Sequence, residues 1–203
     1  LYFTFSFSQT TDWVKSFGWT KNDKGISIGT DSLGYIYCSG YFNSEATFGN
    51  FTLTNSNSTL YNNNKENFVF KMDSLGDVLW AIAGGNLSGG CCDDRALGMH
   101  VTPGGDVFIT GTFWSSYNLG PLSVSGTQLN NHSTSLLAKV DKDGNPVWVI
   151  GFGADNTSGG CSLPIYDADD ASYDVTVDDD GFIYVTGFFS GYSAEFDGFT
   201  ITN

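Results

Sequence analysis

Apolar side chains alternate with polar or small ones in many short segments of the chain, a pattern typical of half-buried β-strands. Ile26 and Ile28 alternate with Gly and Ser, and Tyr173, Val175 and Val177 alternate with Asp and Thr. No long window places apolar residues at i, i+3, i+4 and i+7, as an amphipathic helix requires. The pattern therefore predicts an all-β protein.

The strand-like segments recur at a regular interval. Trp13, Trp80 and Trp148 are spaced by 67 and 68 residues, and the second and third end the related phrases FVFKMDSLGDVLW (68–80) and LLAKVDKDGNPVW (136–148). Each phrase predicts a strand, a Gly-containing tight turn and a second strand that ends in Trp.

Two further phrases each occur three times. The first phrase is DSLGYIYCSGYF, TPGGDVFITGTF and DDDGFIYVTGFF in its three copies, and the second is FGNFTLTN, LGPLSVSG and FDGFTITN. The first phrase predicts a central strand that is apolar on both faces, so we expect this strand to be covered on both sides. Its apolar residues are Ile36 and Cys38, Val107 and Ile109, and Ile183 and Val185. We therefore expect three tandem four-stranded units of about 68 residues, at 1–67, 68–135 and 136–203.

The order of these phrases resembles the SBBP-type β-propeller repeats of secreted bacterial proteins. The shared pattern is W…G, D-x-x-G-x-x-Y-x-T-G, F-G and then F-V-x-K-x-D-x-x-G-x-x-x-W, and it covers nearly the whole chain in three copies. The resemblance implies units like propeller blades and a place in large secreted or surface proteins, and it is poorly specific for function.

The opening segment, LYFTFSFSQTTDW, is in register with the phrases at 68–80 and 136–148, although Gln9 stands where they have a turn glycine. One interpretation is a β-strand and the other is the remnant of an export signal. The apolar core of a signal is continuous, whereas T-F-S-F-S alternates, which favours the strand.

In this register the third unit lacks its closing hairpin, and the start of the chain offers one. Three blades fall short of the usual four to eight of a closed propeller. The chain is then either part of a longer propeller or repeat array, or an open array in which residues 1–13 complete the sheet of a neighbouring copy. The expected assembly strand contains Leu1, Phe3, Phe5, Phe7 and Trp13, and the expected repeat core contains Trp80 and Trp148.

Charge excludes several classes of partner. The formal net charge is −14, with one Arg and seven Lys among 203 residues, so no basic stripe is present to neutralise nucleic-acid phosphates or anionic lipids. No run approaches the roughly 18 apolar residues of a membrane span. The four cysteines do not have the spacing of a zinc motif, and five N-x-S/T sequons occur. Together these features favour an extracellular or cell-surface protein.

Two sets of residues are candidate sites. A disulfide from Cys161 to Cys91 or Cys92 would connect adjacent units if their Ser-Gly-Gly-Cys loops lie side by side, the alternatives being free thiols or intersubunit bonds. Asp167, Asp169 and Asp170 are candidate calcium ligands in a long predicted loop, the alternative being a solvated acidic loop. The segment DKDGN (141–145) is better interpreted as a hairpin turn than as a calcium loop.

No catalytic motif of the type G-x-S-x-G or H-E-x-x-H and no phosphate-binding glycine loop occurs, so we expect no enzyme and no certain cofactor. The sequence favours an extracellular structural protein that assembles head to tail with itself into a surface filament or repetitive array. The alternative is an adhesin or lectin-like module of a larger secreted β-propeller protein, contacting surface glycans through Trp19 or Trp114 with calcium as an aid.

Overall fold

The fold consists of β-strands joined by turns and loops. A computed structural model describes residues 12–18, 21–55, 64–86, 93–126, 133–154, 170–190, 193–196 and 198–202, and every regular element within these ranges is a strand. Sixteen strands are arranged in four antiparallel sheets, none of which closes on itself. The expected all-β, open architecture is confirmed.

Two of the sheets have six strands each and the same strand order. Sheet 1 has the order β1-β2-β5-β6-β9-β10. Its strands are β1 (Lys24–Thr30), β2 (Ile36–Asn43), β5 (Lys65–Met72), β6 (Val78–Gly85), β9 (Ser116–Leu119) and β10 (Leu122–Ser125). Sheet 2 has the order β7-β8-β11-β12-β15-β16. Its strands are β7 (Arg95–Val101), β8 (Val107–Trp114), β11 (Ser133–Val140), β12 (Pro146–Ala154), β15 (Ser193–Phe196) and β16 (Phe199–Thr202).

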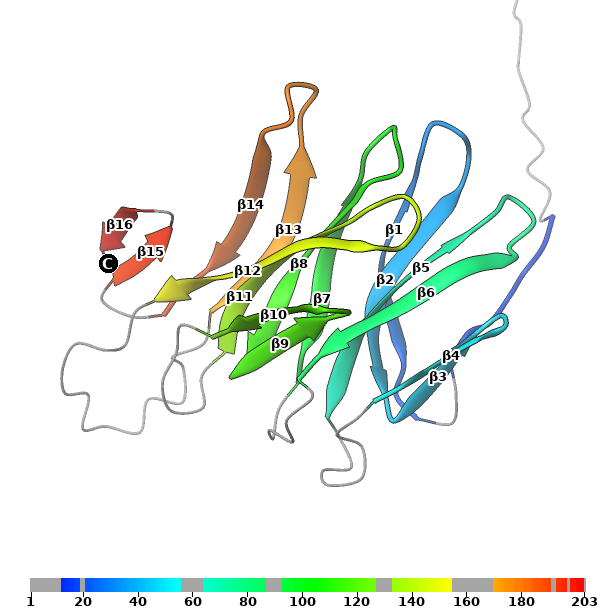
Figure 1. Ribbon diagram of the computed structural model, residues 1–203, viewed down its shortest axis with the longest axis horizontal. Coiled ribbons are helices and arrows are strands. Elements are labelled where there is room, and N and C mark those ends of the chain that lie inside the picture. Colours follow the sequence, from blue (N-terminus) through cyan, green and yellow to red (C-terminus); the bar gives the residue numbers. More distant parts are fainter. Residues whose placement is uncertain are drawn as a thin grey trace, which may run out of the picture.

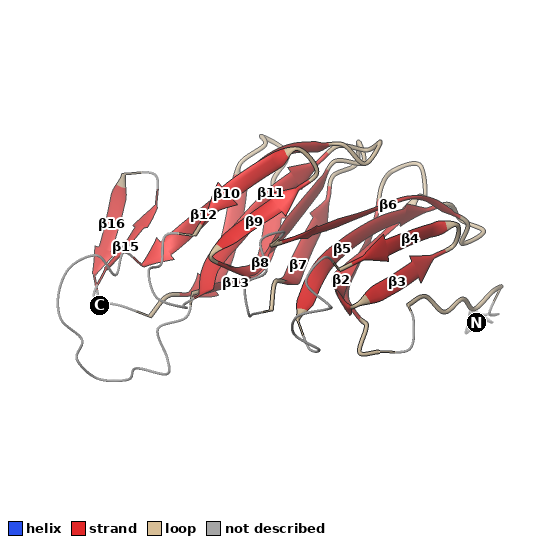
Figure 2. Ribbon diagram, turned by 60° about the horizontal axis from the view of Figure 1, so that its bottom comes forward, coloured by secondary structure: helices blue, strands red, loops and turns tan. Residues whose placement is uncertain are grey.

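The other two sheets are single hairpins. One pairs β3 (Glu45–Phe48) with β4 (Phe51–Thr54), and the other pairs β13 (Ala171–Val177) with β14 (Ile183–Phe188). The sheets follow one another along the long axis of the molecule, with the N-terminal described residues at one end and β15–β16 at the other (Figures 1 and 2).

Each six-stranded sheet takes its last hairpin from a later part of the chain. The β9–β10 hairpin follows β8 of sheet 2 in sequence, but Leu119 and Asn118 pair with Gly84 and Gly85 at the end of β6. In the same way β15–β16 joins sheet 2 through β12. Each six-stranded sheet therefore combines strands from two of the expected units, sheet 1 across the expected boundary at residue 67 and sheet 2 across the one at residue 135, because local pattern does not specify which neighbouring edge a hairpin joins. The division into 1–67, 68–135 and 136–203 stays a prediction.

Apolar cores fill the spaces between successive sheets. The central core lies between sheet 1 and sheet 2 and includes Tyr37 and Val69 from the first sheet and Ile109 and Phe113 from the second. The N-terminal core lies between sheet 1 and β3–β4, and the C-terminal core lies between sheet 2 and β13–β14. Burial of these facing surfaces is the main favourable contribution to such a fold.

The strand β11 contributes to the cores on both of its sides. Leu136, Ala138 and Val140 face the central core, whereas Leu137 faces the C-terminal core. The strand β5 alternates in the same way. Its residue Val69 faces the central core, whereas its residues Phe68, Phe70 and Met72 face the N-terminal core. A strand that is apolar on both faces needs a neighbouring sheet on each side.

Aspartates close four of the hairpin turns. In the turn that connects β11 to β12, Asp141 Oδ1 accepts hydrogen bonds from the backbone N–H groups of Asp143 and Asn145, at 2.9 and 2.8 Å. Loss of hydration opposes ionisation, but hydrogen bonds from Asn145 and Asp143 outweigh it and hold the pKa of Asp141 below its usual value. The hairpin-turn interpretation of residues 141–145 is confirmed. Equivalent turns are closed by Asp31, Asp73 and Asp178.

Two of the recurring tryptophans each reach a hairpin turn of the sheet that follows them. The indole N–H of Trp80, on β6, donates to the Lys142 carbonyl at 3.1 Å, and that of Trp13 donates to the Ser74 carbonyl at 2.9 Å. Each ring lies over the glycine of the turn that it reaches, Gly144 for Trp80 and Gly76 for Trp13. Trp80 therefore joins sheet 1 to sheet 2, and Trp13 joins the N-terminal described segment to sheet 1.

We expect Gly144→Ala to destabilise the fold more than Gly181→Ala. Both glycines have a left-handed φ, 89° and 87°, but a Cβ at Gly144 would lie 2.8 Å from the Trp80 ring, whereas one at Gly181 would meet nothing within 4 Å. The strained backbone alone costs about 1–2 kcal/mol, and the overpacked contact adds about 1–3 kcal/mol. Urea unfolding measures both variants, and equal losses would contradict the role of Trp80.

Candidate functional site

The two-stranded sheets at the ends of the molecule are incomplete compared with the six-stranded ones. In sheets 1 and 2 the second strand, β2 or β8, pairs along eight residues with β5 or β11. The corresponding strand at the C-terminal end, β14, pairs with β13, and no other strand of the described residues pairs with it. The edge of β14 that is not paired with β13 is the first element of the candidate site.

The strand β14 is also uncovered on its faces. All six of its residues are exposed, whereas β2 and β8 are largely buried. Around it Phe182, Tyr184 and Phe188 are 64%, 55% and 43% exposed. The expectation that the strand with Ile183 and Val185 is covered on both sides is therefore wrong for the described chain, because β13–β14 packs against sheet 2 on one face only and all six residues of β14 are exposed.

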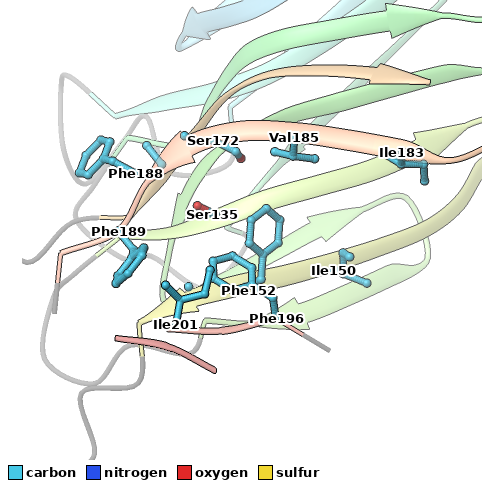
Figure 3. A pocket seen from close by; sticks show the side chains of 13 residues that line it. Ser135, Ile150, Phe152, Ser172, Ile183, Val185, Phe188, Phe189, Phe196 and Ile201 are labelled. Atoms are coloured by element: carbon cyan, nitrogen blue, oxygen red, sulfur yellow. The ribbon is translucent and has the colours of Figure 1, made fainter. Parts of the chain in front are cut away.

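An apolar cleft of about 490 Å³ opens between this strand and sheet 2. Ile183 and Val185 of β14 line one side, and Ile150 and Phe152 of β12 line the other (Figure 3). Phe196 and Ile201, from β15 and β16, close its lower end with further apolar surface. A cleft with this lining favours the binding of apolar side chains.

The second element of the site lies at the N-terminal end, where residues 12–18 run beside the β3–β4 hairpin. The Gly18 N–H donates to the Thr47 carbonyl at 3.1 Å. Phe17 packs against Phe48 and Phe70, with ring centroids 6.1 and 5.1 Å apart. Gly18 precedes Gly85 by 67 residues, and Gly85 pairs with the β9–β10 hairpin in sheet 1. Residues 12–18 thus hold the same position toward β3–β4 as β6 holds toward β9–β10.

The structure describes only some of the predicted site residues. Trp13 and Trp80 make the contacts given above, and Trp148 packs edge-on against Phe108 with ring centroids 6.0 Å apart. Trp114 is half-buried at the end of β8. Outside the described residues lie Leu1, Phe3, Phe5 and Phe7 of the assembly strand, Cys91, Cys92 and Cys161 of the disulfide prediction, Asp167 and Asp169 of the calcium prediction, and Trp19. Those predictions remain untested.

Asp170, the third candidate calcium ligand, is fully buried and bound to backbone. Its carboxylate accepts hydrogen bonds from the N–H groups of Ala154 at 2.7 Å and Ser190 at 3.1 Å. These bonds tie the end of β12 to the segment that follows β14. Within the described ranges no group of three His, Cys, Asp or Glu side chains is placed to hold a metal ion.

A buried aspartate of this kind recurs, and sequence reasoning missed it. Asp94 accepts hydrogen bonds from the backbone N–H groups of Asn86 at 2.8 Å and Trp114 at 3.0 Å. Burial raises the pKa of Asp94 well above its usual value, although these two hydrogen bonds act in the opposite direction. The signal was the Asp that precedes each recurring strand, β1, β7 and β13, at Asp23, Asp94 and Asp170.

An ion cluster joins sheet 1 to sheet 2 near these aspartates. Asp93 accepts hydrogen bonds from Lys65 of β5, at 2.5 Å, and from Arg95 of β7. Both cations also lie over the Tyr41 ring, 5.6 and 5.8 Å from its centroid. Burial opposes ionisation of Asp93, but the two cations outweigh it and lower its pKa.

No model of a protein family matches the chain, and no curated protein matches it. The SBBP resemblance therefore rests on the quoted phrases alone. In the part of the chain that the structure describes, no helix is long and apolar enough to cross a membrane.

We expect Asp93→Asn to destabilise the protein by about 1–2 kcal/mol at neutral pH, because charged hydrogen bonds to Lys65 and Arg95 are weakened. The folded pKa of Asp93 lies below the unfolded value near 3.8, so its contribution is complete above that pH and is lost as pH falls through the folded pKa. The difference between wild type and variant should shrink on acidification in denaturant titrations. A difference that is constant down to pH 2 would contradict this role.

Proposed function

We propose that the protein is a non-enzymatic structural subunit that assembles head to tail with copies of itself by β-strand complementation, forming a surface filament or repetitive array outside the cell. One observation carries this proposal. The β13–β14 hairpin at one end corresponds to the first two strands of a six-stranded sheet, and the β3–β4 hairpin at the other end corresponds to the last two.

The C-terminal end supplies the first half. The hairpin β13–β14 corresponds to β1–β2 and β7–β8, because all three pairs have a register irregularity at the same place, after Gly25, Ala96 and Ser172. In sheets 1 and 2 this pair is followed by a longer hairpin, β5–β6 or β11–β12. The open edge of β14 is where the equivalent hairpin would pair.

The N-terminal end supplies the second half. The hairpin β3–β4 corresponds to β9–β10 and β15–β16, and residues 12–18 already lie beside it as β6 lies beside β9. Residues 1–9 of one copy would therefore pair with β14 of the next copy, and residues 11–18 would connect them to β3–β4, which completes the order β13-β14-(1–9)-(11–18)-β3-β4. The two surfaces of this contact differ, so each added copy presents a new open edge and the contact propagates.

Physical chemistry supports closing the edge in this way. An open strand flanked by exposed aromatic side chains otherwise pairs unspecifically with other chains. The net charge of −14 opposes association of identical copies, and this repulsion is screened by salt. Assembly should therefore become stronger as ionic strength rises.

Analytical ultracentrifugation and negative-stain electron microscopy of the 203-residue chain test the proposal. We expect a concentration-dependent series of oligomers and linear particles, favoured by 0.5 M over 0.02 M NaCl. A variant that lacks residues 1–11 should remain monomeric and keep the β-sheet circular dichroism spectrum, because those residues supply the pairing strand.

A wild-type chain that stays monomeric from micromolar to near-millimolar concentration at both salt levels would contradict the proposal. Oligomers that persist unchanged in the variant lacking residues 1–11 would also contradict it, because assembly would then use another surface.

A further inference from the structure

One side of the cleft beside β14 corresponds, residue by residue, to one side of the central core. In the central core, Val107 and Ile109 of β8 face the space between sheets 1 and 2. In the cleft, Ile183 and Val185 of β14 take the corresponding positions, 76 residues later, and face sheet 2 (Figure 3). The cleft is thus the counterpart of a space that is filled elsewhere in the same molecule.

The strand β11 supplies what fills the central core. Leu136, Ala138 and Val140 are each fully buried there, and they lie opposite Gly111, Ile109 and Val107 of β8. None of the described residues takes the corresponding place beside β14, where Gly187, Val185 and Ile183 line the cleft.

The sequence contains one segment with the register to fill that place. Leu1, Phe3 and Phe5 precede Leu136, Ala138 and Val140 by 135 residues. Resting on the head-to-tail assembly proposed above, we propose that Leu1, Phe3 and Phe5 of a second copy insert into this cleft, opposite Gly187, Val185 and Ile183.

The chemistry of the cleft suits these side chains. Its lining includes Phe152, Phe188, Phe189 and Phe196, so two inserted phenylalanine rings would meet aromatic partners. Aromatic pairs contribute about 0.5–1.5 kcal/mol beyond the area that they bury. The larger side chains of the inserted strand, Phe in place of Ala138 and Val140, face a cavity of about 490 Å³.

The opposite face of the inserted strand, which contains Thr4, would lie beside a carboxylate and a tyrosine rather than beside apolar groups. Thr4 corresponds to Lys71 and Lys139. The Lys71 Nζ lies 3.9 Å from Asp31 Oδ2 and 5.0 Å from the centroid of Tyr37, whose hydroxyl donates to the same carboxylate.

Beside β14, Asp178 and Tyr184 repeat this arrangement, with the tyrosine hydroxyl donating to the carboxylate at 2.9 Å. A lysine at position 4 of the inserted strand would therefore meet an acceptor that the fold already uses for lysine, whereas a lysine at position 3 would be buried among apolar groups.

Phe3→Lys and Thr4→Lys form a matched pair that tests the insertion, because they add the same charge to adjacent residues. We expect Phe3→Lys to weaken association measured by sedimentation at least 100-fold and Thr4→Lys to keep it or strengthen it. Association of Phe3→Lys at the wild-type level would overturn the insertion while leaving head-to-tail assembly intact. A monomeric wild type would instead overturn the proposed function itself.

A mixing experiment identifies the receiving surface. Val185→Lys places a charge in the cleft, so this variant keeps an intact strand, whereas Phe3→Lys keeps an intact cleft. Each variant alone should be monomeric, with the circular dichroism spectrum of wild type. An equimolar mixture should form a one-to-one complex that does not grow, which native mass spectrometry detects. A mixture that stays monomeric, or that forms long oligomers, would overturn the assignment of this cleft.

Discussion

Burial of apolar sheet faces against one another determines the architecture, because the internal sheets are apolar on both sides. In β11, Leu136 and Leu137 point to different cores, and Val69 in β5 points away from the phenylalanines on either side of it. A sheet built from such strands is stable only between two neighbours. The interior sheets have both neighbours, and the terminal pair β13–β14 has one.

Polar groups in this fold mostly fix the connections between strands. The aspartates of the hairpin turns satisfy backbone N–H groups, as Asp141 does, while Asp94 and Asp170 satisfy buried N–H groups at strand ends. A buried carboxylate is tolerated here because several donors compensate for its lost hydration. The acidic composition is thus partly structural, which reduces the weight of individual aspartates as evidence for calcium.

Much of the strand content could be predicted from the sequence, because alternation and Asp-x-x-Gly turns are local signals. The hairpins at 68–80 and 136–148 formed as β5–β6 and β11–β12 for this reason. The transfer of β9–β10 to the preceding sheet could not be predicted, since its pairing with Gly84 and Gly85 depends on edges that only the packed sheets create. Of the candidate site, alternation predicted the assembly strand, whose first residues lie outside the described chain. The cleft could not be predicted, because it is formed by side chains from strands more than thirty residues apart, such as Ile150 and Ile183.

The exchange of hairpins between sheets also affects how the molecule responds to damage. Sheet 1 contains β9 and β10, which follow β7 and β8 of sheet 2 in the sequence. The strands of sheet 1 and sheet 2 therefore alternate along the chain, and no single cut of the backbone separates one of these sheets from the other. A protease that cleaves between β6 and β7 would leave two fragments joined by the β6–β9 pairing, the central core and the Trp80 contact. Such a molecule therefore stays in one piece after a break in the backbone between β6 and β7.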